Sequence, residues 1–358
     1  MVILNVKLDN IYGFRNFEIN FSYPKKIVNS LIPSEHLPGR LNFRYKKAVI
    51  LMGANASGKT TLGKALYVIL NYLRTDDSYG LWTFRGDDNI PAKFSIDFVA
   101  KKNILSRFTG DLSPKSMFFD YFEAEIREQD SYEKAVKRLK GANIVGDDFA
   151  FLKYRFAYPG VTHSLQTDGL NPAIVQKVLE SVIGTLDPTL ANVSISKDLK
   201  DSFIIRKKGI EVIIQDGKLL NKEALSSGTI EGVDISMFLA GMLQENDCFY
   251  YCDEHFSYIQ SDIEKRIFGI MLDHLGDYDQ LIFTTHNMDM LDLNLPKHAY
   301  AFLRKKPDEN GDYKISAVYA DEYLKRNTDS IRSAVENDIF DSLPDDSLLD
   351  QLDREYAF

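Results

Sequence analysis

The pattern of apolar and polar positions in the first hundred residues predicts several strands and one helix. Residues 2–8 and 17–23 alternate between apolar and polar side chains, as paired strands do. Residues 48–52 form a continuous apolar run that predicts a buried strand, and residues 61–73 carry apolar side chains at helical spacing. Residues 94–99 predict a further strand. The chain is therefore expected to open with a hairpin and then to run from a buried strand into a helix.

Strand and helix patterns alternate in the second half of the chain. A hairpin pattern over residues 202–214 is followed by helical spacing at 230–244 and an apolar strand at 248–252. A helix over 261–275 and a strand over 280–284 come next. Strands that alternate with helices in this way predict a mainly parallel sheet. The expected fold class is α/β, with a mixed or parallel sheet and antiparallel strands at the N-terminus.

The segment between these halves has a different pattern. Residues 111–200 suggest mixed helical segments, including Tyr121–Arg127 and Tyr132–Lys140, with loops between them. We interpret this segment as a mainly helical insertion. The expected parts of the chain are an N-terminal lobe over 1–110, the insertion over 111–200, a C-terminal lobe over 201–320 and an acidic tail or helix over 321–358.

A phosphate-binding loop lies between the buried strand and the first helix. Residues 53–60, GANASGKT, match the pattern G-x-x-x-x-G-K-[ST] in the context that this motif requires. Its glycines allow a tight turn whose backbone N–H groups point at phosphates, and the helix N-terminus adds to the attraction. Lys59 would reach the outer phosphates, and Thr60 would bind Mg²⁺. The residues expected to hold the nucleotide are Gly53, Asn55, Ser57, Gly58, Lys59, Thr60 and Thr61.

Two carboxylates follow the apolar strand at 248–252. Open α/β sheets bind their ligands at the carboxyl ends of the strands, where Asp253 and Glu254 would lie. Asp253 would hold Mg²⁺, directly or through water, and Glu254 would orient and deprotonate the attacking water. Taken alone, an acidic pair of this kind fits a helix cap equally well.

Two further segments carry polar groups at the ends of predicted elements. Residues 225–229, LSSGT, precede a helix, so their hydroxyl and N–H groups form a small anion-binding site. His286 lies in residues 284–287, TTHN, after the next strand, where its imidazole could contact a γ-phosphate or the attacking water. In isolation the first segment is also an ordinary helix cap, and the histidine fits a structural role.

The order of these four segments resembles that of an ABC-type ATPase of the SMC, RecF and OLD-like branch. The phosphate loop resembles that branch's G-x-N-x-S-G-K-[ST] form, and residues 225–229 resemble its signature motif. Ser227 and Thr229 depart from the transporter form Leu-Ser-Gly-Gly-Gln. The resemblance implies an ABC-type P-loop NTPase fold and hydrolysis of ATP to ADP and phosphate with Mg²⁺. It implies catalytic roles for Lys59, Glu254 and His286, and metal-binding roles for Thr60 and Asp253.

The same resemblance implies a site shared between two subunits. In the family, the signature motif of one subunit closes on the nucleotide held by another, so Ser227 and Gly228 would contact the γ-phosphate across a head-to-tail homodimer. The segment Phe14–Phe17 resembles an N-terminal element whose arginine, here Arg15, approaches the nucleotide; an exposed turn arginine is the alternative. The family's Q-loop glutamine has only Gln129 and Gln166 as candidates, neither with a supporting motif.

Composition bears on partners and location. The formal net charge of −9 over 358 residues argues against a nonspecific nucleic-acid coat, which depends on neutralising phosphates. No apolar stretch approaches the ~20 residues that span a bilayer, so we expect a cytoplasmic protein without membrane contact. Lys134, Lys137, Arg138 and Lys140 could share one helix face, which leaves nucleic acid as an alternative partner.

The end of the chain resembles a narrower group, the compact OLD-like ATPases of bacterial defence and toxin modules. Together with the lack of a recognisable effector motif in this sequence, that resemblance leads to the hypothesis of an ATP-driven dimeric switch that controls a separately encoded effector, a nuclease or toxin in antiphage defence. Two alternatives stay open. One is a DNA-repair or chromosome-associated ATPase that binds DNA directly, and the other is a scaffold that binds ATP without turnover.

Overall fold

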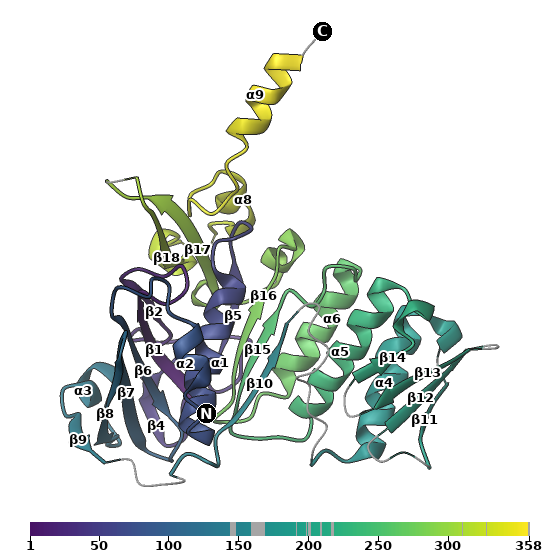
Figure 1. Cartoon of the computed structure of the whole chain (residues 1–358), viewed down its shortest axis with the longest axis horizontal. Coiled ribbons are helices and arrows are strands. Elements are labelled where there is room, and N and C mark those ends of the chain that lie inside the picture. The colour runs from purple at the N-terminus through teal and green to yellow at the C-terminus, as the bar shows by residue number, and fades with distance from the viewer. Residues whose placement is uncertain are drawn as a thin grey trace.

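The structure, a computed structural model, combines two six-stranded sheets with a helix between them and a helical layer on one side (Figure 1). It describes residues 1–143, 148–158, 169–190, 192–197, 199, 202–207, 210–215, 218–309, 311–326 and 328–356. Within these residues, no helix is both long and apolar enough to cross a membrane.

The first sheet is antiparallel throughout, with strand order β2-β1-β6-β7-β8-β9. Its strands are β1 (Val2–Asp9), β2 (Phe17–Asn20), β6 (Ala92–Val99), β7 (Ile104–Ser113), β8 (Ser116–Glu125) and β9 (Lys140–Ala142). Val6 of β1 lies opposite Ile19 of β2 and Ile96 of β6, so apolar side chains share one face. The predicted N-terminal hairpin is confirmed.

The second sheet is parallel except for its last strand, with order β10-β15-β16-β5-β17-β18. Its strands are β10 (Lys153–Ala157), β15 (Cys248–Asp253), β16 (Gln280–Thr284), β5 (Ala48–Met52), β17 (Tyr300–Pro307) and β18 (Tyr313–Tyr319). Every residue of β5, β15 and β16 is buried, as expected of parallel strands covered on both faces. The predicted parallel sheet is confirmed, and β5, β15 and β16 end at one edge.

Helix α1 (Lys59–Thr75) fills the space between the two sheets. Its Leu62, Leu66 and Ile69 pack in one cluster with Ile96 of the first sheet and Tyr251 of the second. The other face of the second sheet is covered by α5 (Ser227–Met242) and α6 (Ser261–Asp273), with α4 (Pro172–Leu186) packed against α5. Helix α5 is therefore buried almost all around.

A third, four-stranded antiparallel sheet packs on α4. Its strands, in spatial order, are β11 (Asn192–Ile195), β12 (Ser202–Lys207), β13 (Ile210–Gln215) and β14 (Lys218–Leu220). The hairpin predicted over residues 202–214 is confirmed by the pairing of β12 with β13. Its expected turn, Lys208–Gly209, lies outside the described residues.

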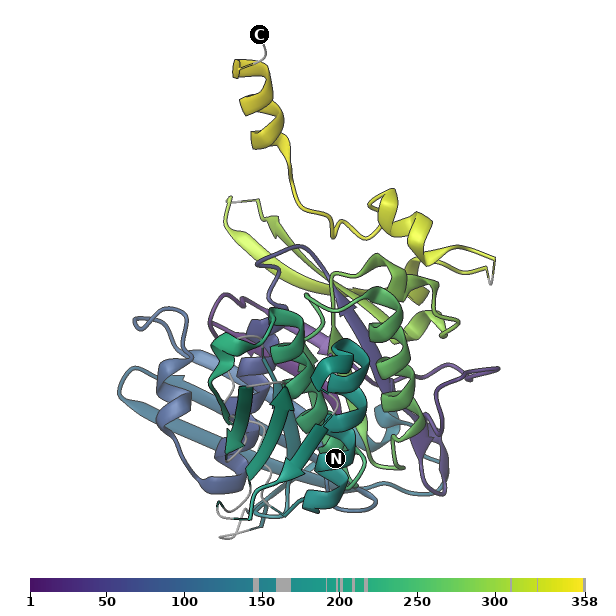
Figure 2. The same ribbon diagram turned by 90° about the vertical axis from the view of Figure 1, so that its right-hand side faces the viewer.

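The remaining elements are short. They are β3 (His36–Leu37), β4 (Arg40–Arg44), α2 (Tyr79–Thr83), α3 (Tyr132–Val136), α7 (Ala320–Tyr323), α8 (Ile331–Glu336) and α9 (Ser347–Tyr356), with 3₁₀ turns at Pro188–Leu190, Lys222–Ala224, Met288–Asp292 and Lys297–Ala299. Helix α8 packs into the core through Ile331, Ala334 and Val335. In contrast, α9 has no buried residue and extends away from the body (Figure 2).

The structure corrects the prediction for residues 111–200. The predicted helix over Tyr121–Arg127 is wrong, because residues 121–125 belong to β8, which pairs with β7 along its whole length. Residues 118–122 hold four aromatic side chains, which favour a pleated strand surface over a helix. The insertion thus mixes strands with one long helix, α4. The division into four domains stays a prediction.

The predicted basic helix face is also wrong. Helix α3 ends at Val136, so of the four cations only Lys134 lies on it, and Lys140 begins β9. Arg138 is paired with Asp130 and donates a hydrogen bond to the Glu125 carbonyl at 3.0 Å. These contacts hold Arg138 against its own chain.

Candidate nucleotide-binding site

Glycine is required at two positions of the phosphate loop. Gly53 has a φ of 146° and Gly58 a φ of 105°, both in the region that favours glycine. A Cβ on Gly53 would lie 2.3 Å from the Leu303 carbonyl oxygen, and one on Gly58 would lie 3.2 Å from the Phe14 ring. The loop therefore packs tightly between β17 and the turn after β1. This packing determines the path of the backbone from the loop into α1.

The side chain of Lys59 is directed back into this loop. Its ammonium donates hydrogen bonds to the carbonyl oxygens of Gly53 at 2.8 Å and Ala54 at 3.2 Å, and it lies 3.2 Å from Glu254 Oε1. The side chain is only 3% exposed. Burial lowers the pKa of Lys59, while the neighbouring Glu254 carboxylate opposes that shift. A buried cation thus lies inside the loop predicted to surround phosphates.

Glu254 joins Lys59 to His286. His286 Nε2 lies 2.8 Å from Glu254 Oε1, so the ring N–H donates to the carboxylate. The pKa of Glu254 is lowered to about 2, mainly by the hydrogen bond from His286 and further by the positive charge of Lys59. The carboxylate is therefore ionised at neutral pH and borders a cavity of about 500 Å³ that Ser257 and Asn287 also line. The structure brings together the three residues predicted to be catalytic.

Asp253 is held between two threonine hydroxyls. Thr60 Oγ1 donates to Asp253 Oδ2 at 2.6 Å, and Thr284 Oγ1 donates to Oδ1 at 2.7 Å. Burial raises the pKa of Asp253, and the two hydroxyl donors oppose that shift. The adjacent hydroxyl and carboxylate oxygens of Thr60 and Asp253 are the hard ligands that Mg²⁺ prefers together with substrate phosphates. The residues present therefore fit the predicted metal.

The loop also fits a phosphate. Ser57 Oγ is buried and has no hydrogen-bond partner within the described residues, and the Cβ position of Gly53 is 2.8 Å from it. An unpaired buried hydroxyl is costly, and a phosphate oxygen would satisfy it. Of the other predicted contacts, Thr61 is half-buried in the first turn of α1, whereas Asn55 is exposed on the loop.

Arg15 lies beside the loop rather than in it. The Phe14 ring packs near Gly58, but the Arg15 guanidinium donates to the Phe14 carbonyl at 3.1 Å and lies near Gly86. Its nucleotide contact stays a prediction.

Of the two Q-loop candidates, Gln129 accepts a hydrogen bond from Asn42 at 3.3 Å, and Gln166 lies outside the described residues.

Ser227 and Gly228 lie at the N-terminus of α5, on the opposite side of the second sheet from α1. Ser226 caps this helix, because its hydroxyl accepts a hydrogen bond from the Thr229 N–H at 3.2 Å. The segment lines a cavity of about 430 Å³ together with Thr185 and Tyr258. Among the described residues that line this cavity, none belongs to the phosphate loop. One chain thus does not bring the two motifs together.

Several supporting residues were not predicted. Tyr251 donates from its hydroxyl to the Lys59 carbonyl at 2.5 Å, which ties β15 to the first turn of α1. Glu264 accepts hydrogen bonds from Thr285 at 2.8 Å and Asn287 at 2.6 Å, so it positions the segment that carries His286. The Ala54 N–H donates to the Ser342 carbonyl at 3.0 Å. Of these supporting residues, Ala54, Thr285 and Asn287 lay within motifs that the sequence singled out.

Comparisons with known proteins identify the fold. Neither protein-family models nor curated proteins give a match. Among solved structures, the SMC head bound to the C-winged helix domain of ScpA is 13% identical with a TM-score of 0.51, over 90% of this chain and 100% of that chain. The Smc head domain with an extended coiled coil, bound to the C-terminal domain of ScpA derived from Pyrococcus furiosus, is 12% identical with a TM-score of 0.50, over 90% and 98%.

At these identities the likeness concerns the fold alone. The chain has the mixed α/β fold of these SMC head domains, and the predicted fold class is confirmed. The predicted OLD-like branch has no support among these structures.

Proposed function

We propose that this protein binds and hydrolyses ATP and that two copies close head to tail around the nucleotide. The observation that carries the proposal is the separation of two complementary halves within one chain. The phosphate loop lies with Asp253, Glu254 and His286 at one place, whereas Ser227 and Gly228 line a separate cavity. A second copy would bring its α5 N-terminus, with its partial positive charge, to the exposed γ-phosphate.

The chemistry follows from the contacts of the site. A bound phosphate would draw Lys59 away from Glu254, because both groups compete for the ammonium, and the carboxylate would become free to accept a proton from water. His286 would hold Glu254 in place through its ring N–H. Bound Mg²⁺ would supply charge neutralisation on the phosphates, held by Thr60 and Asp253. Glu254 in the base position favours turnover over a scaffold that only binds ATP.

The test combines native mass with phosphate release. For Glu254→Gln with Mg-ATP we expect a stable dimer, because nucleotide binds but hydrolysis is blocked. For Lys59→Ala we expect a monomer without ATP binding. For the wild-type protein we expect slow phosphate release, and for both variants a loss of at least about 100-fold. A Glu254→Gln protein that binds ATP yet stays monomeric would overturn the shared site, and unchanged turnover in both variants would overturn the enzymatic role.

We further propose that ATP-driven closure of the dimer acts as a switch. It would control a separately encoded protein effector, a nuclease or toxin of antiphage defence. Support for a protein partner is that both SMC heads described above are bound to parts of ScpA. Purification of tagged Glu254→Gln protein from its own host with Mg-ATP tests this step. A second polypeptide at constant ratio would identify the effector, whereas a bare dimer would shift the proposal toward direct action on DNA.

A further inference from the structure

The C-terminal helix α9 carries an apolar face that its own chain does not cover. Leu348 is 77% exposed, Leu349 68%, Leu352 53% and Tyr356 70%. At about 100° per residue these four side chains lie within a stripe about 100° wide along the helix. Figures 1 and 2 both show α9 extended away from the rest of the protein. Such an amphipathic helix is typical of a segment that docks elsewhere.

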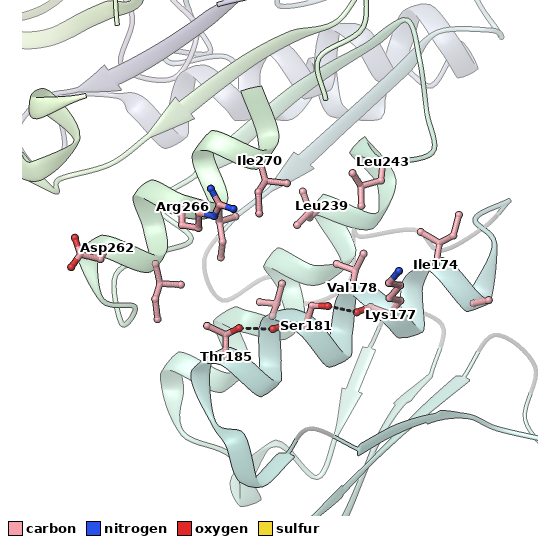
Figure 3. A pocket seen from close by; sticks show the side chains of 14 residues that line it. Ile174, Lys177, Val178, Ser181, Thr185, Leu239, Leu243, Asp262, Arg266 and Ile270 are labelled. Carbon is pink, nitrogen blue, oxygen red and sulfur yellow. Dashed lines mark hydrogen bonds between the residues drawn. The ribbon is translucent and has the colours of Figure 1, made fainter. Parts of the chain in front are cut away.

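A groove with an apolar lining, like the apolar face of α9, runs between α4, α5 and α6. Figure 3 shows α4 and α6 as its two walls, with Leu239 and Leu243 of α5 between them. Its volume is about 890 Å³. Besides these two leucines, the apolar side chains that line it are Ala173, Ile174, Val178, Val182, Ile263, Ile267 and Ile270. The groove is therefore a mainly aliphatic channel along two helices.

The helix and the groove agree in length and in charge. The α4 wall from Ala173 to Thr185 spans about 18 Å, and the ten residues of α9 span about 15 Å, at about 1.5 Å per residue. Two exposed cations, Lys177 on one wall and Arg266 on the other, outnumber the one carboxylate of the lining, Asp262. On α9, acidic side chains flank the apolar stripe on both sides. These are Asp353 on one side and Glu355 on the other.

The chain fixes the point from which α9 departs. The Ser342 carbonyl accepts the hydrogen bond from the Ala54 N–H of the phosphate loop. The Phe340 ring stacks on Phe302 at 4.1 Å, and Asp341 pairs with Arg304 at 3.2 Å. Only residues 343–346 separate this anchored segment from α9, and four residues reach at most about 14 Å. The tail helix therefore begins close to its own phosphate loop.

The groove opens toward the other half of the proposed shared site. Thr185 and Ile263 line both the groove and the cavity formed by Ser227 and Gly228. In the head-to-tail pair this cavity faces the phosphate loop of the second copy, which is where the second copy's α9 departs. We infer that α9 of each copy docks in the α4–α6 groove of the other copy. This exchange of the two C-terminal helices would stabilise the ATP-bound dimer. This inference rests on the proposed function above.

Cysteine cross-linking tests the exchange. Cys248 and Cys252 are both buried, so introduced cysteines would be the reactive ones. One Glu254→Gln chain carries Leu352→Cys on the apolar face of α9, and a second, differently tagged Glu254→Gln chain carries Ser181→Cys in the groove. After mixing with Mg-ATP and a short bismaleimide, we expect a cross-link between the two chains. The matched control, Asp350→Cys on the opposite face of α9, is expected to give little product.

The outcomes separate this inference from the proposed function. A dimer that forms with ATP but gives no cross-link, or one equal to the Asp350→Cys control, overturns the tail exchange and leaves the shared site intact. Absence of any dimer overturns the shared site itself. A cross-link within a single chain that carries both cysteines, with none between chains, places α9 in its own groove and overturns the exchange.

A second variant avoids dependence on cysteine reactivity. Leu349→Asp with Leu352→Asp puts charge on an already exposed helix face, so the body of the protein should fold unchanged. We expect the dissociation constant of the ATP-bound Glu254→Gln dimer to rise about tenfold or more, because apolar burial is lost, while ATP binding is retained. Asp350→Asn is the control. An unchanged dissociation constant overturns the exchange.

Discussion

The phosphate-loop half of the site and the α5 half differ in how their polar groups are satisfied. In the first, charged side chains partner one another within the chain, as Lys59 does with Glu254, and Asp253 accepts from two hydroxyls. In the second, the cap residues are uncharged, and the helix N-terminus of Ser227 and Gly228 borders open space. One half holds the residues proposed to be catalytic, whereas the other offers a helix N-terminus beside a cavity. The proposed head-to-tail dimer would join two such different halves in each site.

The largest expected effect is on phosphate release, when each half of the site is inactivated in a different chain. Lys59→Ala removes the first half, and Ser227→Arg blocks the second with a bulky side chain. We expect each variant alone to lose phosphate release by at least about 100-fold. An equal mixture should recover up to about a quarter of wild-type activity, because half of the dimers then contain one intact shared site.

Phosphate release by the separate proteins and by their mixture checks this expectation. Ser333→Arg, on the exposed side of α8, is the control for adding a surface arginine and should leave activity unchanged. A mixture no more active than its components would show that the two halves do not act across a dimer.

A smaller effect is expected at the contact between α1 and β15, which supports only the first half. A Cβ on Gly63 would lie 2.6 Å from the Tyr251 ring. Gly63→Ala should therefore lower the free energy of unfolding by about 3 kcal/mol and weaken ATP binding. Chemical denaturation measures the first quantity and nucleotide titration the second.

Gly269→Ala on α6 is the matched control. Apart from its chain neighbours and its own helix backbone, no atom of the described residues lies within 4 Å of its Cβ position, and alanine is the better helix former. The control should be neutral or stabilising. Equal behaviour of the two variants would show that the Tyr251 contact does not hold the loop in place.

The smallest effect is expected inside the second half, at Asp234 of α5. Burial, followed by the charge of Glu231, raises the pKa of Asp234 to about 7 from its ordinary 3.8, and His255 Nε2 lies 3.8 Å from its carboxylate. Its folded pKa is raised, so its contribution to stability is full below about pH 4 and is lost as the pH rises through 7. Asp234→Asn should therefore stabilise the protein increasingly toward pH 8.

Denaturation at pH 5 and pH 8 checks this dependence. The advantage of Asp234→Asn should grow by about 3 kcal/mol between the two values. Asp262→Asn, at an exposed position of α6, serves as the control and should show no such trend. A constant difference would mean that Asp234 ionises normally in the folded protein.

The sequence predicts the local motifs of this chain better than the contacts between distant segments. The phosphate loop is contiguous, and its glycines are required by local backbone geometry, so residues 53–60 suffice to identify it. Strands β5, β15 and β16 were predictable because each contains a short run of apolar residues. In contrast, the link between Ala54 and Ser342 joins residues far apart in the chain. No local pattern reports such a contact.

The errors have a physical cause as well. Residues 121–125 were predicted to be helical, yet their conformation is set by pairing with β7 rather than by local preference. The basic cluster failed for a similar reason, because a helix that ends at Val136 cannot align cations up to Lys140. Tertiary pairing thus decided the structure where local patterns were weak.

The backbone at Glu254 has a consequence for how the protein could be improved. Its φ of 48° lies in the left-handed region, where a residue other than glycine costs about 1 kcal/mol or more. Glycine would remove this strain and the proposed catalytic base together. Because Glu254 also pairs with the buried Lys59 ammonium at 3.2 Å, its loss would leave that cation without its carboxylate, so a more thermostable form of this protein would have to gain its stability at other positions.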